Sequence, residues 1–366
     1  MNHLVIDGSH GEGGGQVLRS ALTLAMIVGR PLRLENIRAG RKQPGLAAQH
    51  LTCVRAAASL CNAHVVGAEL GSQALEFAPR DRISPGEYDF DVAEARLGGS
   101  AGAVMLVLQT ILLPLALAGG DSCVILRGGT HVKSSPSFDY IRDVWLPMLA
   151  RMGVHAGLSL IRAGWYPLGG GEVRLCVEGM NGRPRALCVE ERGNLQTVRG
   201  KALTAKLPAH IAQRMADRAR ACLKDAGIAA TIETVDLRAA CAGAGLFLTA
   251  VYEQGLAGFN ALGERGKPAE RVADEACAAL LCHYRSGAAI EEHLADQLIV
   301  PAALGDGRSV FSVERVTRHL ATNAWVVERF GLAEVEILPA AQGTATVTIR
   351  NCASRMNDCR HRLPGY

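Results

Sequence analysis

The order of predicted strands and helices repeats along the chain, and this repeat is what most limits the possible folds. Residues 3–79 read as strand, helix, strand, helix, strand, strand, and residues 87–179 repeat that order. In the second copy we expect helices at 100–118 and 136–152. Residues 292–349 repeat the later part of the order, with a helix expected at 316–330. Three βαβαββ units are the simplest interpretation: an α/β (α+β) fold in which each unit is a four-stranded sheet with two helices. We expect the helices to pack inward around one shared core.

A segment with a different order of predicted strands and helices separates the second and third units. Residues 185–285 predict an inserted, smaller α/β domain, so the large domain comprises 1–184 and 286–350. The predicted elements of the insert are strands at 195–204, 228–235 and 245–253 and helices at 209–226 and 269–284. The pattern leaves open whether the last helix belongs to the insert or begins the third unit. Residues 351–366 lack periodicity and are expected to form a loose tail.

One segment, residues 101–120, is apolar enough to require a check for a membrane span. Gln109 lies near its centre and Pro114 interrupts it, so we expect a buried helix of a soluble domain and no membrane partner. A glutamine in so apolar a helix needs a hydrogen-bonding partner, either a neighbour or a ligand.

The charge balance and the cysteines favour an anionic substrate and a reducing compartment. Six of the 39 basic residues are lysine, which leaves 33 arginines. Arginine suits bidentate phosphate contacts, although GC-rich codon usage explains the excess equally well. The 11 cysteines show no C-x-x-C pair or zinc spacing, and no targeting segment is evident, so we expect reduced thiols and a cytoplasmic setting. Cys277, Cys282 and His283 are expected to be ordinary helix residues.

A glycine-rich loop, "HGEGGGQ", follows the first predicted strand and precedes a helix at 15–28. Such loops let backbone N–H groups approach an anion at the positive end of a helix. This loop lacks the Gly-Lys-Ser/Thr ending of a P-loop and the spacing of a dinucleotide fingerprint. It carries Glu12 among the glycines and Arg19 one turn into the helix. The alternative is a tight turn without a ligand.

Two further strand-to-helix corners carry cations. "NIRAGRKQPGLAAQH" presents five polar side chains, those of Arg38, Arg41, Lys42, Gln49 and His50. It indicates either a phosphate cradle or a solvated basic loop, with equal weight. "RGGTHVKSSPSFDY" presents Arg127, His131 and Lys133 at the equivalent corner of the second unit. We therefore expect both corners to face one cleft.

Two late helices carry candidate catalytic and nucleotide-binding groups. "EEHLADQLIVPAAL" places His293 and Gln297 four residues apart on one face, beside Asp296. Such a set could bind a nucleotide or a divalent cation, or simply form an exposed helix start. In "RVTRHLATNAWVVERF", His319 is expected one turn into a helix. A lone histidine is usually structural, but a neutral, oriented imidazole can attack phosphorus and form a phosphoramidate.

Taken together, these segments resemble the RNA 3′-terminal phosphate cyclase family. The stretches that carry the resemblance run in order from about residue 4 to 349: "DGSHGEGGGQVLRSALTL", "IRAGRKQPGLAAQHL", "GAELGSQ", "LVLQTILLPLALAGG", "GGT", "HLADQLIVPAAL" and "RHLATNAWVVERF". The resemblance implies three βαβαββ units, shared with enolpyruvyl transferases and a translation-initiation-factor domain, plus an inserted domain. The segment "GGTHVKSSPSFDY" and the tail after Ile349 depart from the family pattern, so a role of that corner in RNA binding is in doubt.

The implied activity is that of an ATP-dependent, ligase-type enzyme. His319 matches the family's nucleophile, which attacks the α-phosphorus of ATP, forms histidine-AMP and releases pyrophosphate. AMP then passes to the RNA 3′-phosphate, giving RNA-ppA. The vicinal 2′-hydroxyl attacks that phosphorus to form the 2′,3′-cyclic phosphodiester, and AMP leaves. Only RNA supplies this hydroxyl, so the expected partners are ATP and RNA with a 3′-phosphate end.

The resemblance also implies roles for single residues. Glu12 matches a ligand of a divalent metal, Mg²⁺ or Mn²⁺. ATP-binding positions are Gly13, Gly14, Arg19, Gln109, His293, Leu294, Ala295, Asp296 and Gln297. Positions for phosphate or RNA are Arg38, Arg41, Gln49 and His50. The association of chains is left open, with a homodimer among the alternatives.

Two other functions remain as alternatives. A catalytically silent paralogue of the family serves as a ribosome-assembly, RNA-binding factor, but that branch lacks the histidine that is present here as His319. An enolpyruvyl transferase shares the fold only and would need no nucleotide. Dependence on ATP separates the two enzymes.

Overall fold

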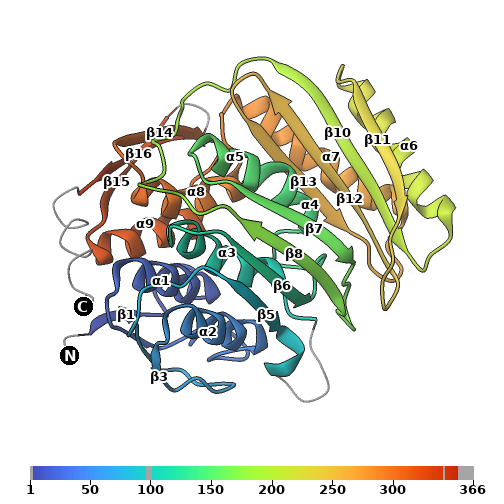
Figure 1. Cartoon of the computed structure of the whole chain (residues 1–366). Helices are drawn as coiled ribbons and strands as arrows, with labels where there is room; N and C mark the ends of the chain where they lie inside the picture. Colours follow the sequence, from blue (N-terminus) through green and yellow to red (C-terminus); the bar gives the residue numbers. More distant parts are fainter. Residues whose placement is uncertain (1–2, 96–100, 341–342, 353–366) are drawn as a thin grey trace.

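The first unit shows the strand order on which the large domain is built. The computed structural model describes residues 3–95, 101–340 and 343–352. Its first elements are β1 (Leu4–Asp7), α1 (Gly15–Val28), β2 (Leu32–Glu35), α2 (Ala48–Cys61), β3 (His64–Val66) and β4 (Leu75–Ala78). Figure 1 shows this unit in blue; its sheet order is β1-β2-β4-β3, with β1 and β2 parallel. The predicted βαβαββ order is confirmed here.

The second unit repeats this order as β5-β6-β8-β7. Its elements are β5 (Glu87–Asp91), the 3-10 turn η1 (Val92–Ala95), α3 (Val104–Ala116), β6 (Ser122–Gly128), α4 (Phe138–Tyr140), the π-helical η2 (Ile141–Trp145), α5 (Leu146–Arg151), β7 (Ala156–Arg162) and β8 (Gly171–Val177). The helix expected over 136–152 is thus one helical segment with a π turn, 138–151. The helix expected over 100–118 begins at Val104, and residue 100 lies outside the described residues.

The third unit is complete, and its first strand lies before the insert. It contains β9 (Cys188–Val189), α8 (Glu292–Leu304), β14 (Arg308–Val313), α9 (Arg318–Phe330), β15 (Ala333–Pro339) and β16 (Ala345–Asn351) in the sheet order β15-β16-β14-β9. The two residues of β9 pair in parallel with β14. The insert therefore begins after Val189 and not at residue 185, because a strand of two residues has too little periodicity to be recognised.

The insert forms its own sheet and its own core. It contains β10 (Leu195–Ala205), α6 (Ala209–Asp225), β11 (Ala230–Asp236), β12 (Gly243–Tyr252), β13 (Leu256–Leu262) and α7 (Ala269–Ser286), with the sheet order β11-β10-β12-β13. The strand β13 was not predicted. Helix α7 packs on this sheet in a separate buried cluster, which settles that it belongs to the insert.

Arg192 holds together the two chain segments that connect the insert to the third unit. Its Nη2 donates to the carbonyl of Tyr284 over 2.6 Å, and its Nη1 donates to the carbonyls of His283 and Ala288 over 2.9 and 3.3 Å. The start of the insert and its end therefore lie side by side.

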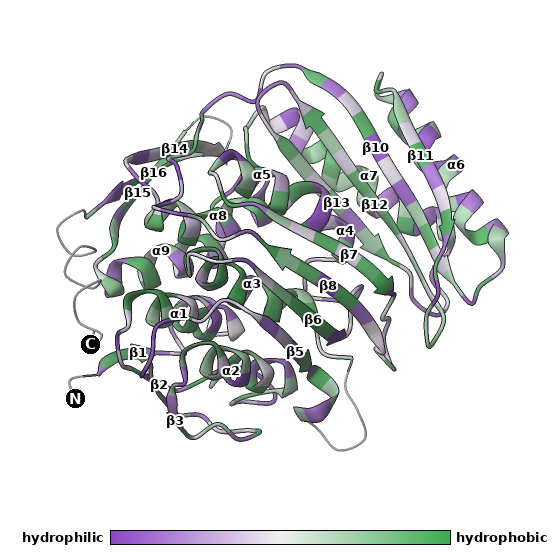
Figure 2. Cartoon of the chain, in the orientation of Figure 1, coloured by the Kyte–Doolittle hydropathy of each residue, from purple (hydrophilic) through white to green (hydrophobic). Residues whose placement is uncertain are grey.

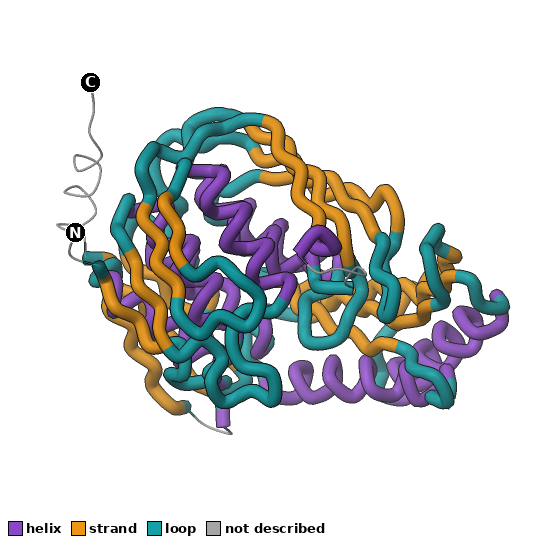
Figure 3. The backbone as a smooth tube through the Cα atoms, turned by 90° about the horizontal axis from the view of Figure 1, so that it is seen from below, coloured by secondary structure: helices purple, strands orange, loops and turns teal. Residues whose placement is uncertain are grey.

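The helices of all three units share one core. Helix α1 contacts α2, α3 and α9, and α8 contacts α9. Figure 3 shows these helices gathered on the inside with strands outside them. Figure 2 shows hydrophobic residues concentrated on the helices of the large domain, whereas α6 of the insert carries many hydrophilic ones. The expected inward packing of the helices is confirmed.

Within the described ranges, none of the helices combines the length and apolar character needed to cross a bilayer. Asn351 ends β16, and the remainder of the predicted tail, from residue 353 onward, lies outside the described residues. Cys277 is buried, and His283, also buried, donates a hydrogen bond from Nδ1 to Oε2 of Glu314 over 3.1 Å.

Candidate functional site

The glycine loop of the first unit rests on helix α9 of the third. Gly11 and Gly13 have φ angles of +63° and +61°, which favour glycine. A Cβ atom on Gly11 would collide with the Thr322 hydroxyl. The backbone N–H of Glu12 donates to Thr322 Oγ1 over 3.0 Å. The path of the loop is therefore fixed by a residue of another unit.

Asn323 joins three helices beside this loop. Its Oδ1 accepts from Ser20 Oγ over 2.6 Å and from Gln16 Nε2 over 3.1 Å, both on α1. Its Nδ2 donates to the backbone carbonyl of Asp296 on α8 over 2.8 Å. Asn323 is only 1% exposed, so its hydrogen bonds with Ser20 and with the Asp296 carbonyl are shielded from water. Sequence reasoning missed Gln16, Thr322 and Asn323, whose only signal is a polar residue within an apolar stripe.

His319 lies at the very start of α9. The helix begins at Arg318, not at 316 as expected, and Thr317 caps it by accepting from the Leu320 N–H over 3.0 Å. His319 is therefore the second helical residue and not one turn inside. Burial lowers the pKa of its imidazole, and the charges of Arg19, His293 and Arg41 lower it further. The ring is thus neutral at neutral pH and lies near the guanidinium groups of Arg19 and Arg41.

Glu12 is the carboxylate of this site. Its Oε1 forms an ion pair with the exposed Arg41, and its Oε2 is buried without a hydrogen-bond partner among the described residues. Among the residues that the structure describes, no group of three or more His, Cys, Asp or Glu side chains is placed to hold a metal ion. A hard cation that keeps its waters and binds one carboxylate and a phosphate fits this arrangement.

A small cavity lies between α1, α3 and α8. Its volume is about 40 Å³, room for about one water molecule. It is lined by Gln16, Arg19, Ser20, Thr23, Gln109, Leu113, Trp145, Asp296, Gln297, Val300, Pro301 and Asn323. Gln109 Nε2 donates to Gln297 Oε1 over 2.7 Å, so the glutamine of the apolar helix has a neighbour as its partner.

Asp296 is the buried acid of the cavity. Burial raises its pKa well above the ordinary value, the charge of Glu291 raises it further, and Arg19 opposes both effects. Burial also lowers the pKa of Arg19. Arg19 Nη2 donates to Gln16 Oε1 over 2.5 Å, which directs the guanidinium along the cavity wall.

The predicted run from His293 to Gln297 is divided between three environments. Leu294 and Ala295 are 0% exposed and pack in the core, whereas the side chain of His293 is 66% exposed. The backbone N–H groups of His293 and Leu294 both donate to the Glu291 carboxylate over 2.7 Å. Of this run, the side chains of Asp296 and Gln297 reach the cavity.

The first basic corner lies next to Arg19. His50 Nδ1 accepts from the Ala47 N–H over 3.2 Å, and burial, together with Arg19 and Arg38, lowers the pKa of His50 to about 3. Arg38 has a φ of +54° and donates from Nη1 to the carbonyl of Gly45 over 2.7 Å. His50 also lies beside Gly15 at the end of the glycine loop, and Arg38 lies close enough to His50 to affect its pKa. Lys42 is exposed.

Gln49 has a bridging position in the same corner. Its Oε1 accepts from the N–H of Ala103, the N-cap residue of α3, over 3.1 Å. The side chain therefore links the first unit to the second.

The second basic corner does not join the site. Arg127 pairs with Asp89 and, over 3.2 Å, with Glu172. His131 is buried and lies 3.0 Å from Asp139 Oδ2, and Lys133 pairs with Glu264 of the insert over 2.6 Å. The expectation that both corners face one cleft is wrong for these three side chains, because neighbouring strands hold Arg127, Asp139 of the same segment holds His131, and the insert holds Lys133.

The sequence also matches known proteins. The family model described as RNA 3′-terminal phosphate cyclase matches residues 10–337. A relative of that name from Methylococcus capsulatus is 66% identical over 349 residues, which cover 95% of this chain and 97% of the relative. A relative of the same name from Nostoc punctiforme is 54% identical, over 91% of this chain and 95% of the relative. One from Salmonella agona is 45% identical, over 89% of this chain and 92% of the relative. The chain belongs to the RNA 3′-terminal phosphate cyclase family.

Proposed function

We propose that this chain converts an RNA 3′-phosphate to a 2′,3′-cyclic phosphodiester with the consumption of ATP, through a covalent histidine-AMP. The names of its relatives support the cyclase activity. The observation that carries the mechanism is the state of His319: a half-buried imidazole whose lowered pKa keeps it neutral among Arg19, Arg41 and His293. A neutral imidazole has the free electron pair that a nucleophile needs, and nearby cations attract a phosphate.

In the first step, His319 attacks the α-phosphorus of ATP. An N–P bond forms, the bond to the bridging oxygen breaks, and pyrophosphate leaves with that electron pair. Arg19 and Arg41 stabilise the charge that develops on the phosphoryl oxygens, because their positions are fixed before the reaction. Gly13 and Gly14 precede the first turn of α1 and offer backbone N–H groups to the phosphates.

The second half of the reaction needs the RNA end beside His319. The 3′-phosphate takes AMP from the histidine, which regains its free electron pair. The 2′-hydroxyl then attacks the activated phosphorus, and AMP leaves. Arg38 and Arg41 would hold the RNA phosphate, with His50 and Gln49 keeping the corner in shape by their hydrogen bonds to Ala47 and Ala103.

Glu12 would hold a divalent cation, Mg²⁺ or Mn²⁺, through its unpartnered Oε2. When bound, the ion supplies positive charge that offsets the charge of the triphosphate. Gln109, Asp296 and Gln297 would bind the adenylate. Because the cavity has room for about one water molecule, nucleotide binding requires the hydrogen bond between Gln109 and Gln297 to open.

The test is transfer of label from α-³²P-ATP to the purified protein with a divalent cation, read by denaturing electrophoresis. Wild type should carry an acid-labile, base-stable label that His319→Ala lacks. His155→Gln removes an exposed histidine outside the site and should label as wild type does. Absence of label on folded, AMP-free wild type sinks the mechanism and favours the RNA-binding, ribosome-assembly alternative.

A further inference from the structure

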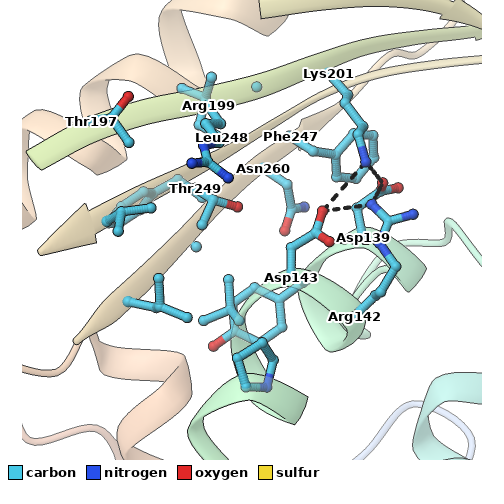
Figure 4. Close-up of a pocket in the computed structure, with 18 of the residues that line it drawn as sticks. Asp139, Arg142, Asp143, Thr197, Arg199, Lys201, Phe247, Leu248, Thr249 and Asn260 are labelled. Atoms are coloured by element: carbon cyan, nitrogen blue, oxygen red, sulfur yellow. Dashed lines mark hydrogen bonds and ion pairs between the residues drawn. The ribbon is translucent and has the colours of Figure 1, made fainter. Parts of the chain in front are cut away.

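A second, larger cavity lies between the insert and the second unit. Its volume is about 810 Å³, and its walls are the sheet of the insert and the helical segment 138–151 (Figure 4). None of the residues assigned above to catalysis or nucleotide binding lines it. We call it the insert groove.

Arg199 of β10 lies on the floor of the insert groove among threonines. Thr231 of β11 and Thr249 of β12 are its direct cross-strand partners, and Thr197 precedes it by two residues on its own strand. Residues in these positions share one face of a sheet. All four side chains line the groove. Arg199 therefore presents a guanidinium flanked by three hydroxyl groups.

The other cations of the groove are neutralised. Arg142 pairs with Asp139 and Asp143 over 2.8 and 2.6 Å, and Lys201 lies 3.7 and 3.5 Å from the same two carboxylates. By contrast, no residue in the described parts of the chain forms an ion pair or a hydrogen bond with the side chain of Arg199. Figure 4 shows no dashed line at its guanidinium, which lies away from the network around Asp139.

Register explains why Arg199 has no acidic partner. In the strand register Glu233 of β11 stands opposite Lys201, two residues further along β10, whereas threonines stand directly opposite Arg199 on both neighbouring strands. A guanidinium with neighbouring hydroxyl donors offers several N–H and O–H groups and no negative charge. That combination recognises a phosphate group, whose oxygens accept from both kinds of donor.

We propose that Arg199, Thr197, Thr231 and Thr249 bind a backbone phosphate of the RNA strand, upstream of the reacting 3′ end. This inference rests on the proposed function, because it takes RNA as the substrate. It assigns to the insert the role of holding the strand, while the large domain acts on its end.

The position of the groove favours an RNA strand, and not a small free anion, as its ligand. The segment 138–151 separates the groove from the catalytic cavity: Asp143 and Val144 face the groove, and Trp145 lines the cavity, where its Nε1 donates to the Gln297 carbonyl over 3.4 Å. The two spaces are thus about one helix diameter apart, roughly 10–12 Å. A strand with a phosphate about every 3.4 Å or more spans that distance with a few nucleotides.

The segment is also tied to the catalytic side by Tyr140. Its ring packs beside Gly258 of the insert, where a Cβ atom would come within 2.7 Å of the ring. Its hydroxyl donates to Glu291, whose carboxylate caps α8. The groove and the helix that carries Asp296 therefore share one rigid support.

The test is equilibrium binding of single-stranded RNA with a 3′-phosphate. Fluorescence anisotropy measures the binding at a series of salt concentrations. The proteins are wild type, Arg199→Gln and the control Arg271→Gln, which removes an exposed arginine from helix α7. The ligands are a dinucleotide and a strand long enough to reach the groove. Arg199→Gln should weaken binding of the long strand roughly tenfold at low salt. Its slope of log K against log salt should fall by about 0.7, the value for one phosphate contact on a single strand.

The same variant should bind the dinucleotide as wild type does, and Arg271→Gln should change neither ligand. Thr249→Val keeps the side-chain shape and removes one hydroxyl, so it should weaken the long strand by a smaller factor. Equal affinity of Arg199→Gln and wild type for the long strand overturns the proposal. So does Arg199-dependent binding of inorganic phosphate with unchanged RNA affinity, which assigns the site to a free anion.

These outcomes are separate from those of the proposed function, because the assay measures binding and needs neither ATP nor turnover. If wild type is never labelled by ATP but its affinity for the long strand still depends on Arg199, the cyclase mechanism fails and the groove stands. If labelling depends on His319 but RNA affinity is independent of Arg199, the groove fails alone.

Discussion

The backbone N–H of Glu12 donates to the hydroxyl of Thr322 over 3.0 Å, although 310 positions separate the two residues in sequence. Glu12 is the candidate metal ligand, and Thr322 lies one turn after His319 on α9. This contact and the hydrogen bonds of Asn323 to Ser20 and Gln16 therefore place the carboxylate and the proposed nucleophile relative to one another across the first and third units. The site exists only when those units are packed together.

This contact makes Gly11 a sensitive position. Gly11→Ala places a Cβ atom against Thr322 in a backbone conformation that favours glycine, so we expect roughly 1–3 kcal/mol of lost stability and loss of histidine labelling. Gly71→Ala is the matched control, because Gly71 has a φ of +78° but open space around its Cβ position. Urea unfolding of both variants separates collision from backbone strain. Equal stability of the two would contradict the collision.

Arg19 should control the protonation of His319. Its charge is the largest electrostatic contribution to the lowered pKa after burial, so Arg19→Met should raise the pKa of His319. A protonated imidazole cannot attack phosphorus, so the acid limb of the labelling rate should move to higher pH. NMR titration of the His319 ring measures the pKa directly, independently of ATP binding. Arg30→Met, an exposed position after α1, should leave that pKa unchanged, and an unchanged pKa in Arg19→Met refutes the assignment.

His50 should make the free energy of unfolding depend on pH in the acidic range. Its pKa is about 3 in the folded protein and 6.5 ordinarily, so the unfolded chain binds the extra proton between those values. Stability from this group is complete above pH 6.5 and is lost as pH falls toward 3, by about 1.4 kcal/mol for each unit. Urea unfolding across this range should show a shallower pH dependence in His50→Gln than in wild type. His155→Gln should keep the wild-type slope, and parallel slopes in all three would show that His50 is not the group responsible.

Asn323 should matter for stability and for activity. Asn323→Leu keeps a similar volume but leaves the carbonyl of Asp296 without this donor and the donors of Gln16 and Ser20 without their acceptor. We expect a loss of roughly 2–4 kcal/mol, since buried groups lose their partners. Ser20→Ala removes one of these bonds and should cost about 1 kcal/mol. Urea midpoints that rank the two variants in the opposite order would show that the network is not centred on Asn323.

The periodicity of the chain was enough to predict the three units, because each contains two helical segments of 13 or 14 residues and its strands in the same order. It could not find β9, whose two residues gain their structure only by pairing with β14. The same limit applies within the site. Glu12, Arg19 and His319 stand out as polar residues in unusual places, but the roles of Thr322 and Asn323 come from contacts across unit boundaries.

The second basic corner shows why chemistry read from spacing can fail. Its position in the second unit matches that of the first corner, so equivalence suggested a shared cleft. In the fold, Arg127 is neutralised by Asp89 and Glu172 on neighbouring strands, and Lys133 reaches Glu264 of the insert. Those partners are set by strand register and by packing of the insert, which the local sequence of the corner does not encode.

Arg192 brings together the two points at which the chain enters and leaves the insert. Because its guanidinium holds the outgoing segment against the carbonyls of His283, Tyr284 and Ala288, the chain departs from the third unit and returns to it at nearly the same place. The sheet of that unit needs nothing from the intervening residues, since β9 and β14 already pair directly. Residues can therefore be added or removed within the insert without separating β9 from β14, the two strands whose pairing completes the sheet of the third unit.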